Sequence, residues 1–246
     1  PIVISRKKEN EERLANFVGS ILFSEEEGLF LAQSGFEKVV AEGSPSDELL
    51  AFAKENKARM IVAARGAKGH FFQNIFGSLP GKLAKTATCP VLLVPEKSRF
   101  QGFKELVFAA DFESVRAPFM QEVLDLAEEF GSTVQFLHAG EDFLKEDALK
   151  DQLAKHLFQD GEPRVGWGFS LLFDGRSAEF SITDWLLENT ADLVVLSTHH
   201  RGFWERMTHH SITDGLVKDL LVPMLVLHES DEPHPDFKIE NHTKTA

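Results

Sequence analysis

Residues 55–62, Glu-Asn-Lys-Ala-Arg-Met-Ile-Val, return 133 positions later as residues 188–195, Glu-Asn-Thr-Ala-Asp-Leu-Val-Val. The same offset holds without a gap over about 60 positions, which is longer than chance similarity sustains. It also aligns Ser44 with Ser177, Phe36 with Phe169, Ser78 with Ser211, and residues 90–94 with residues 223–227. The sequence therefore predicts two copies of one structural unit.

Each copy alternates short apolar runs with amphipathic segments, a pattern typical of parallel strands joined by helices that cover both faces of a sheet. We therefore predict an α/β fold made of two repeated open parallel-sheet units. In the first copy a helix should begin at Pro45, because Ser44 suits the N-cap and acidic residues follow in the first turn. Strands are expected over residues 36–41, 60–64, 91–94, 105–111 and 134–138, and helices over residues 78–86 and through Phe119, Val123, Leu124 and Ala127.

The repeat leaves the first copy incomplete. Subtracting the offset places the first strand and helix of the second copy before residue 1, and places residues 134–138 on residues 1–5. We therefore expect the first copy to lack its opening strand and helix, either through trimming or by nature. The expected organisation is a first unit at residues 1–97, a second unit at residues 98–230, and a mobile tail at residues 231–246.

The composition argues against several classes of protein. A net charge of −13 repels nucleic acid and anionic membrane surfaces, so neither is an expected partner. No apolar run approaches the roughly 20 residues of a membrane helix. The single cysteine, Cys89, permits no internal disulfide, and we expect it to be a buried filler in a reducing compartment, the cytoplasm.

The loop over residues 65–78 is where we expect a ligand in the first copy. Parallel sheets bind ligands beyond the carboxyl ends of their strands, where backbone N–H groups at helix starts receive anions. Glycine lets the backbone approach a phosphate, and Ser78 offers both a hydroxyl and an N-cap. The alternative is a tight strand-to-helix loop that needs glycine for positive φ angles. The candidate nucleotide-binding residues here are Ala64, Arg65, Gly66, Gly69, Gly77 and Ser78.

The strand, its loop, the Gly77-Ser78 pair and the Cys89-Pro90 step together resemble the universal stress protein family. The resemblance extends over nearly the whole chain except its tail. It implies a tandem member with an adenine nucleotide alpha hydrolase-like, Rossmann-like fold. ATP-binding members carry Gly-x2-Gly-x9-Gly-Ser/Thr at this loop, and this chain departs from that pattern with Ala64 and Ala67 at the first two glycine positions. In the second copy the corresponding positions hold Ser197, His200 and His210, followed by Ser211.

The family's other nucleotide contact is an aspartate that ends the first strand, and Asp111 matches it in the second copy. The resemblance implies that this residue lies beside the adenine. An Asx-type turn after a strand is the alternative. The first copy thus keeps glycines of the phosphate loop, whereas the second keeps the aspartate. ATP, accompanied by Mg²⁺, is the ligand that the resemblance implies for at least one half, with the first copy favoured for the phosphates.

Four histidines between residues 198 and 211 form another candidate, a transition-metal site. Adjacent histidines usually diverge, and no cysteine or nearby carboxylate completes the set, so a solvent-facing loop is the preferred interpretation and no metal is assigned. The chain also has no Gly-x-Ser-x-Gly elbow, Walker lysine or Cys-His pairing. No catalytic residue is therefore assigned.

These features favour a binding module over an enzyme. The resemblance implies a stress-response regulator or scaffold in which nucleotide occupancy or partner docking changes assembly. The alternatives are a weak Mg²⁺-dependent ATP hydrolase that uses Gly77 and Ser78, and a structural adaptor without nucleotide. The closing strands, which end at Val94 and Leu227, offer apolar edges that would pair the two halves or form a homodimer.

Overall fold

The structure of the protein is a computed structural model. The structure describes residues 2–22, 37–65, 79–95, 98–112, 115, 117–140, 146–158, 161, 163–172, 175–176, 178–197 and 222–228. Contacts divide the chain into two compact units, residues 1–51 and residues 52–246. The boundaries inferred from the repeat, after residues 97 and 230, stay predictions.

The larger unit is built on one seven-stranded sheet with the order β1-β2-β7-β6-β3-β4-β5. Neighbouring strands are parallel except for β2 and β7, which are antiparallel. The predicted fold class, α/β with a mainly parallel sheet, is confirmed. The strands are β1 (Ile61–Arg65), β2 (Val91–Pro95), β3 (Glu105–Ala109), β4 (Thr133–Ala139), β5 (Trp167–Leu172), β6 (Leu193–Ser197) and β7 (Met224–Leu227). The helices are α5 (Leu79–Thr86), α6 (Ala117–Phe130), α7 (Glu146–Leu157) and α8 (Ala178–Glu188).

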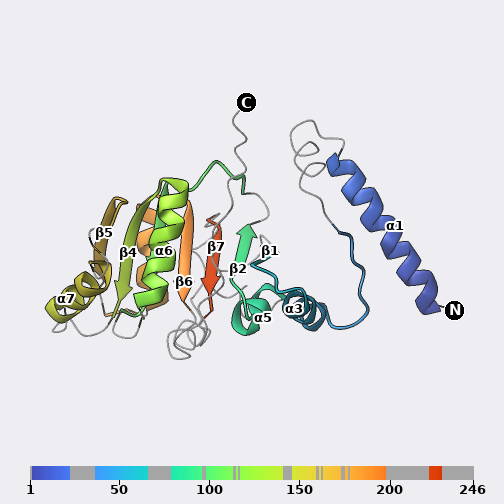
Figure 1. The fold of residues 1–246 in the computed structure, drawn as a ribbon, viewed down its shortest axis with the longest axis horizontal. Coiled ribbons are helices and arrows are strands. Elements are labelled where there is room, and N and C mark those ends of the chain that lie inside the picture. The colour runs from blue at the N-terminus through green and yellow to red at the C-terminus, as the bar shows by residue number, and fades with distance from the viewer. Residues whose placement is uncertain are drawn as a thin grey trace. The chain divides into compact units, whose positions relative to one another are not determined.

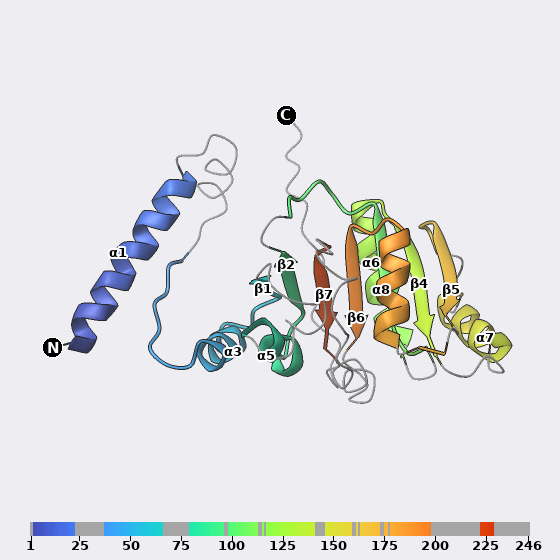
Figure 2. The same ribbon diagram turned by 180° about the vertical axis from the view of Figure 1, so that it is seen from behind.

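Helices cover both faces of the sheet around β3, β4 and β6. Figure 1 shows α6 in front of the sheet, and Figure 2 shows α8 on the opposite face. On the α6 side, the main apolar cluster joins α6 and α7 to β3, β4, β6 and β7. Its aromatic centre consists of Phe108, Phe112 and Phe136, whose ring centroids lie 5.8, 6.0 and 6.1 Å apart in edge-to-face contact. This packing holds the ends of β3 and β4 in place.

The structure repeats at the offset found in the sequence. Ile61 of β1 pairs with Val91 of β2, and Val194 of β6 pairs with Met224 of β7, each 133 positions further on. The same hydrogen bond opens both ladders: Ile61 N donates to Pro90 O at 2.9 Å, and Val194 N donates to Pro223 O at 3.0 Å. The helices α3 (Pro45–Glu55) and α8 (Ala178–Glu188) also match residue for residue. The duplication predicted from the sequence is therefore structural as well.

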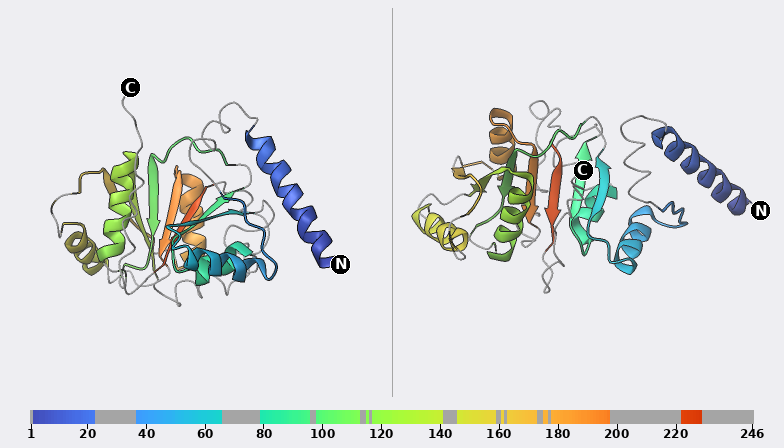
Figure 3. Two further views of the ribbon diagram at one scale, coloured as in Figure 1. Left: turned by 45° about the vertical axis from the view of Figure 1, so that its right-hand side comes forward. Right: turned by 45° about the horizontal axis from the view of Figure 1, so that its top comes forward.

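The antiparallel ladder between β2 and β7 joins the closing strands of the two copies, and Figure 3 shows the two strands side by side. At its centre Leu92 faces Leu225, its own equivalent in the repeat. Val91 faces Val226 and Leu93 faces Met224, so the pairing is symmetric about that point. As a result, the strands of the two copies run in opposite directions, and their carboxyl ends lie at opposite ends of the strands of the sheet.

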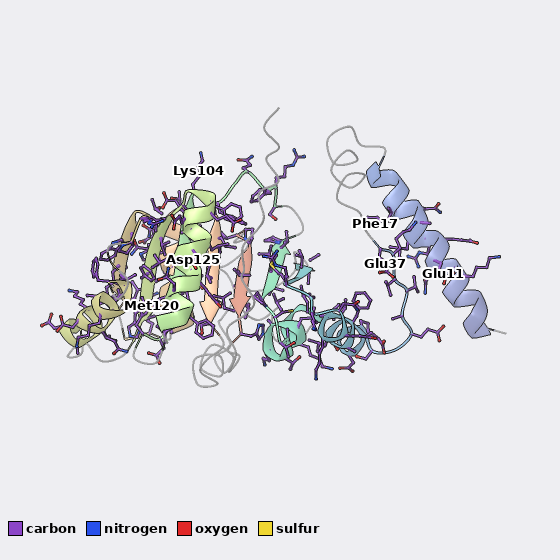
Figure 4. All side chains as sticks on the ribbon, in the orientation of Figure 1. Glu11, Phe17, Glu37, Lys104, Met120 and Asp125 are labelled. Carbon is purple, nitrogen blue, oxygen red and sulfur yellow. The ribbon has the colours of Figure 1, made fainter. Side chains whose placement is uncertain are left out.

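The smaller unit holds α1 (Ile2–Leu22) and the beginning of α3, which starts at Pro45 as predicted. Ser44 precedes that helix, and its carbonyl accepts from Glu48 N at 3.0 Å. Phe17, labelled in Figure 4, is an exposed residue of α1. No helix among the described residues is long and apolar enough to cross a membrane.

Two expectations for the first copy are wrong. Residues 2–5, aligned with the strand at 134–138, lie in helix α1, and residues 37–41 of the strand predicted at 36–41 carry no strand. In the second copy the equivalent strands, β4 and β5, extend outward from β3. No described strand occupies the place of β3 beside β1. A segment without a neighbouring strand leaves its backbone groups unpaired, whereas a helix pairs them internally, so residues 2–5 belong to the helix that continues to Leu22 despite their β-branched side chains.

Asp192 links the start of β3 to the start of β6 by hydrogen bonds. Its carboxylate accepts from Lys104 N at 2.8 Å and from Glu105 N at 3.1 Å, while its own N–H donates to Glu105 O at 2.9 Å. Figure 4 labels Lys104 at the amino end of β3. The first copy has Arg59 at the equivalent position, so this link belongs to the second copy.

His228, directly after β7, connects the second copy to α5 of the first. Its Nε2 lies 2.7 Å from the Ala84 carbonyl oxygen, and both residues are buried. A carbonyl can only accept, so Nε2 carries the proton and donates. Ala84 lies in the last turn of α5, where carbonyls lack partners within the helix. The histidine therefore donates a hydrogen bond to a buried carbonyl at the end of a helix that belongs to the other copy.

We predict that His228→Leu lowers the free energy of unfolding by about 1–3 kcal/mol, because the Ala84 carbonyl would stay buried without its donor. His228→Gln should recover part of the loss, since its amide can donate to the same oxygen. Urea unfolding followed by circular dichroism measures both variants. Equal stabilities for His228→Leu and the parent chain would contradict the assigned role.

Cys89 is buried two residues before the start of β2, in agreement with its predicted role as a filler. Burial raises the pKa of its thiol above the ordinary value of 9.0, and a hydrogen bond with the Ile61 backbone acts weakly in the other direction. The thiolate is therefore scarce at neutral pH, and Cys89 is a poor nucleophile in the folded chain.

We predict that iodoacetamide modifies Cys89 slowly in the folded protein and rapidly in urea, as mass spectrometry would record. Because the folded pKa is raised, the thiol stabilises the fold below pH 9 and loses that contribution as pH rises through the folded pKa. Cys89→Ala should remove this alkaline component from the urea midpoints measured between pH 8 and pH 11. Rapid alkylation of the folded chain would contradict the buried assignment.

Candidate functional site

The strand order indicates where a ligand would bind in the second copy, at the carboxyl ends of its strands. From β3 the chain adds β4 and β5 on one side, then crosses over to add β6 and β7 on the other side. The order therefore reverses between β3 and β6. Open parallel sheets bind ligands at such a switch point, outside the carboxyl ends of the two strands.

Asp111 stands on the β3 side of this switch point. It lies two residues after β3 and is half-buried. The backbone around it is internally bonded: Ala110 N donates to Leu137 O at 3.2 Å, and Val115 N donates to Asp111 O at 3.0 Å. These bonds fix the backbone at Ala110 and Asp111, whereas the Asx-type turn considered for Asp111 would need its side chain and stays a prediction.

His138 is a residue that the sequence interpretation missed as part of this site. It is buried near the end of β4, and its Nδ1 lies 3.3 Å from both Phe112 N and Ala110 O. If Nδ1 is unprotonated it accepts from Phe112 N, and if protonated it donates to Ala110 O. Either tautomer fixes the turn that contains Asp111. The available signal was a histidine that directly follows the apolar pair Phe136 and Leu137 near the end of a strand.

Ser197 stands on the β6 side of the switch point. It is the last residue of β6, is buried, and pairs in register with Leu227 of β7. β6 is also the direct parallel neighbour of β3. Ser197 ends β6 and Asp111 follows β3, so the two residues lie at the carboxyl ends of adjacent strands, one on each side of the switch point. His200 and Ser211, the other two candidates of this copy, lie outside the described residues.

The candidate residues of the first copy do not join this site. Ala64 and Arg65 end β1, which runs parallel to β2 and therefore opposite to β7 and β6. They consequently lie at the other edge of the sheet. Gly66, Gly69, Gly77 and Ser78 are outside the described residues. Of the described candidates, Ala64 and Arg65 therefore lie away from Asp111 and Ser197, at the opposite ends of the strands.

The chemistry of the described walls fits part of an adenine nucleotide. A carboxylate at Asp111 can accept hydrogen bonds from hydroxyl or amino groups, and the Ser197 hydroxyl can donate or accept. The backbone amides of Ala110 and Val115 are already engaged, and that of Phe112 is engaged when His138 Nδ1 is unprotonated, so in that tautomer these three amides form no phosphate cradle. Phosphate groups would have to meet residues beyond Ser197. Within the described part of the chain, no group of three or more acidic, histidine or cysteine side chains could hold a metal ion.

Comparisons with known proteins agree with this architecture. Residues 4–95 match the sequence model of the universal stress protein family, whereas a comparison with curated proteins gave no match. Among solved structures, a universal stress protein from Archaeoglobus fulgidus is similar with a TM-score of 0.54 and 14% identity, over 79% of this chain and 69% of that one.

A functionally unknown protein from Pseudomonas aeruginosa PAO1 is similar with a TM-score of 0.55 and 14% identity, over 82% of this chain and 75% of that one. Identities at this level establish a common fold and nothing more. Residues 4–95 are therefore similar to the universal stress protein family, and the fold of the chain is the one seen in a solved member of that family.

Proposed function

We propose that the protein is a stress-response regulator or scaffold that binds ATP or another adenine nucleotide at the switch point of its second copy. The observation that carries the proposal is the position of Asp111 and Ser197 at the ends of the adjacent strands β3 and β6. Both residues are also candidates from the sequence. Their common edge is where a doubly wound sheet receives a nucleotide.

In this proposal Asp111 accepts from a hydroxyl or amino group of the nucleoside, and His138 keeps the Asp111 turn in place. The phosphates extend toward the segment after β6, which contains His200 and Ser211. A net charge of −13 opposes a polyphosphate, so Mg²⁺ would accompany the nucleotide and reduce the repulsion. The loop from Gly66 to Ser78 stays a second candidate for phosphate in the first copy.

The arrangement of the two copies supports a regulatory or scaffolding role. The ladder between β2 and β7 is the contact through which we propose that the halves pair within one chain, in place of a homodimer formed through those strands. A cytoplasmic location belongs to the same proposal, since the lone Cys89 needs no oxidising compartment. Nucleotide occupancy would then act on a preassembled pair of units.

We predict that Asp111→Ala weakens ATP binding by about ten- to a hundredfold, because a charge-assisted hydrogen bond contributes about 1.5–3 kcal/mol. Isothermal titration calorimetry with Mg²⁺ measures the affinity. Asp125→Ala is the matched control: Asp125 is exposed on α6 and accepts from Gln121 Nε2 at 2.7 Å. Unchanged affinity in Asp111→Ala, with normal urea stability, would remove the site from the second copy.

We predict that the purified protein retains ATP in the presence of Mg²⁺ without turning it over, since no described residue is assigned as a general base. Released phosphate is measured over hours, beside a chemical blank and the Ser78→Ala variant. Turnover abolished by Ser78→Ala would favour the hydrolase instead. Absence of both binding and thermal stabilisation by ATP would favour the adaptor without nucleotide.

A further inference from the structure

The peptide group between Asp111 and Phe112 is held at both of its polar atoms. The Asp111 carbonyl oxygen accepts from Val115 N at 3.0 Å, and Phe112 N lies 3.3 Å from His138 Nδ1, to which it can donate. Phe112 and His138 are both buried, so water does not readily replace this bond. Because a peptide group is planar, its orientation sets the backbone at Asp111 and with it the direction of the carboxylate.

The ring nitrogen of His138 cannot serve both of its backbone neighbours at once. Nδ1 also lies 3.3 Å from Ala110 O. With a lone pair it accepts from Phe112 N, and with a proton it donates to Ala110 O. Buried N–H groups without an acceptor are rarer than under-satisfied carbonyls, so we expect the neutral ring to accept from Phe112 N. An imidazolium carries protons on both nitrogens. Protonation therefore moves the bond from the residue after Asp111 to the residue before it.

The aromatic core beneath the turn keeps this change local. The Phe112 ring makes edge-to-face contacts with Phe108, Phe136 and Phe169, with centroids 5.8, 6.0 and 5.6 Å away. None of these side chains titrates, so the contacts persist when His138 is protonated. The loss of one hydrogen bond thus alters the orientation of the peptide group without removing Phe112 from the core.

The elements around His138 determine how readily its ring takes a proton. The ring lies on the same face of β4 as Phe136, the face that α6 and α7 cover. β5, where Leu171 is its partner, has no titratable residue. Asp111 in the turn and Glu122 on α6 are half-buried carboxylates, which favour the imidazolium, whereas burial opposes it. The charged side chains described on α7 are exposed: Asp147, Lys150, Asp151 and Lys155.

We propose that His138 is a positioning residue whose protonation regulates ligand binding at Asp111. The neutral ring holds the peptide group after Asp111 and keeps the carboxylate directed at its ligand. The protonated ring releases Phe112 N, so the carboxylate loses its fixed direction and binding weakens. The inference rests on the proposed function for its ligand, an adenine nucleotide. The response of the turn to protons depends on no ligand.

The first test follows the full chain by NMR without nucleotide, between about pH 5.5 and about pH 8, the range in which imidazoles titrate. The His138 ring signals report the midpoint of protonation. We expect the protection of the Phe112 amide against hydrogen exchange to fall at least about tenfold as the pH drops through that midpoint. A ring that stays neutral throughout, or equal Phe112 protection on both sides of the midpoint, would overturn the proposal.

His138→Asn is the matched variant, because its side-chain oxygen can stand in the place of Nδ1 and accept from Phe112 N without titrating. Protection of the Phe112 amide should therefore stay high at both ends of the pH range. His156→Asn, which removes a histidine of α7, should leave the parent behaviour unchanged. A pH-dependent loss of protection that persists in His138→Asn would assign the effect to another group and overturn the proposal.

The second test measures ATP affinity with Mg²⁺ by calorimetry at the two ends of that range. From the high to the low pH we expect the parent chain to lose about three- to tenfold more affinity than His138→Asn, as one hydrogen bond accounts for. Asp111 and the phosphates titrate alike in both proteins, so the difference isolates His138. Equal pH dependence would overturn the regulation and leave the proposed function standing. Absence of ATP binding at both pH values would overturn the proposed function and this regulation with it.

Discussion

The antiparallel ladder between β2 and β7 is the interaction on which the rest of the larger unit depends. It joins the last strand of each copy through equivalent residues. Leu92 pairs with Leu225, its equivalent in the other copy, and the register is symmetric about this pair. An open sheet edge is a site for further strand addition, and pairing the two closing strands removes one such edge from each copy. The buried bond from His228 to the Ala84 carbonyl reinforces this junction from outside the ladder.

The same ladder separates the two candidate ligand regions. Because the pairing is antiparallel, the carboxyl ends of the strands in one copy lie far from those in the other copy. Each copy therefore has its own candidate ligand region. The second copy has both walls of its switch point described, with Asp111 on one side and Ser197 on the other. The first copy has Ala64 and Arg65 at the end of β1, with no described strand beside them in the place of β3.

The two copies differ in how far their strands are buried by neighbouring elements, and not in how apolar the strands are. Val62 and Val195 are the same residue type at equivalent positions in matching ladders, yet Val62 is largely exposed and Val195 is fully buried. The difference lies in β3 and α6, which cover only the second copy. It also accounts for the strand predicted at 36–41, of which residues 37–41 carry no strand: a strand forms where a neighbour offers hydrogen bonds, and a local apolar pattern cannot provide that neighbour.

The sequence by itself determined the duplication, the α/β class, the burial of Cys89 and the helix start at Pro45, because these follow from local patterns and from self-comparison. It also identified Asp111 and Ser197 as candidate residues through the resemblance to a family. Only the tertiary structure decided that these two residues share an edge, that Ala64 and Arg65 lie at the opposite one, and that His138 supports the Asp111 turn. The physical reason is that strand order, direction and coverage depend on pairing between distant segments, which no local pattern encodes.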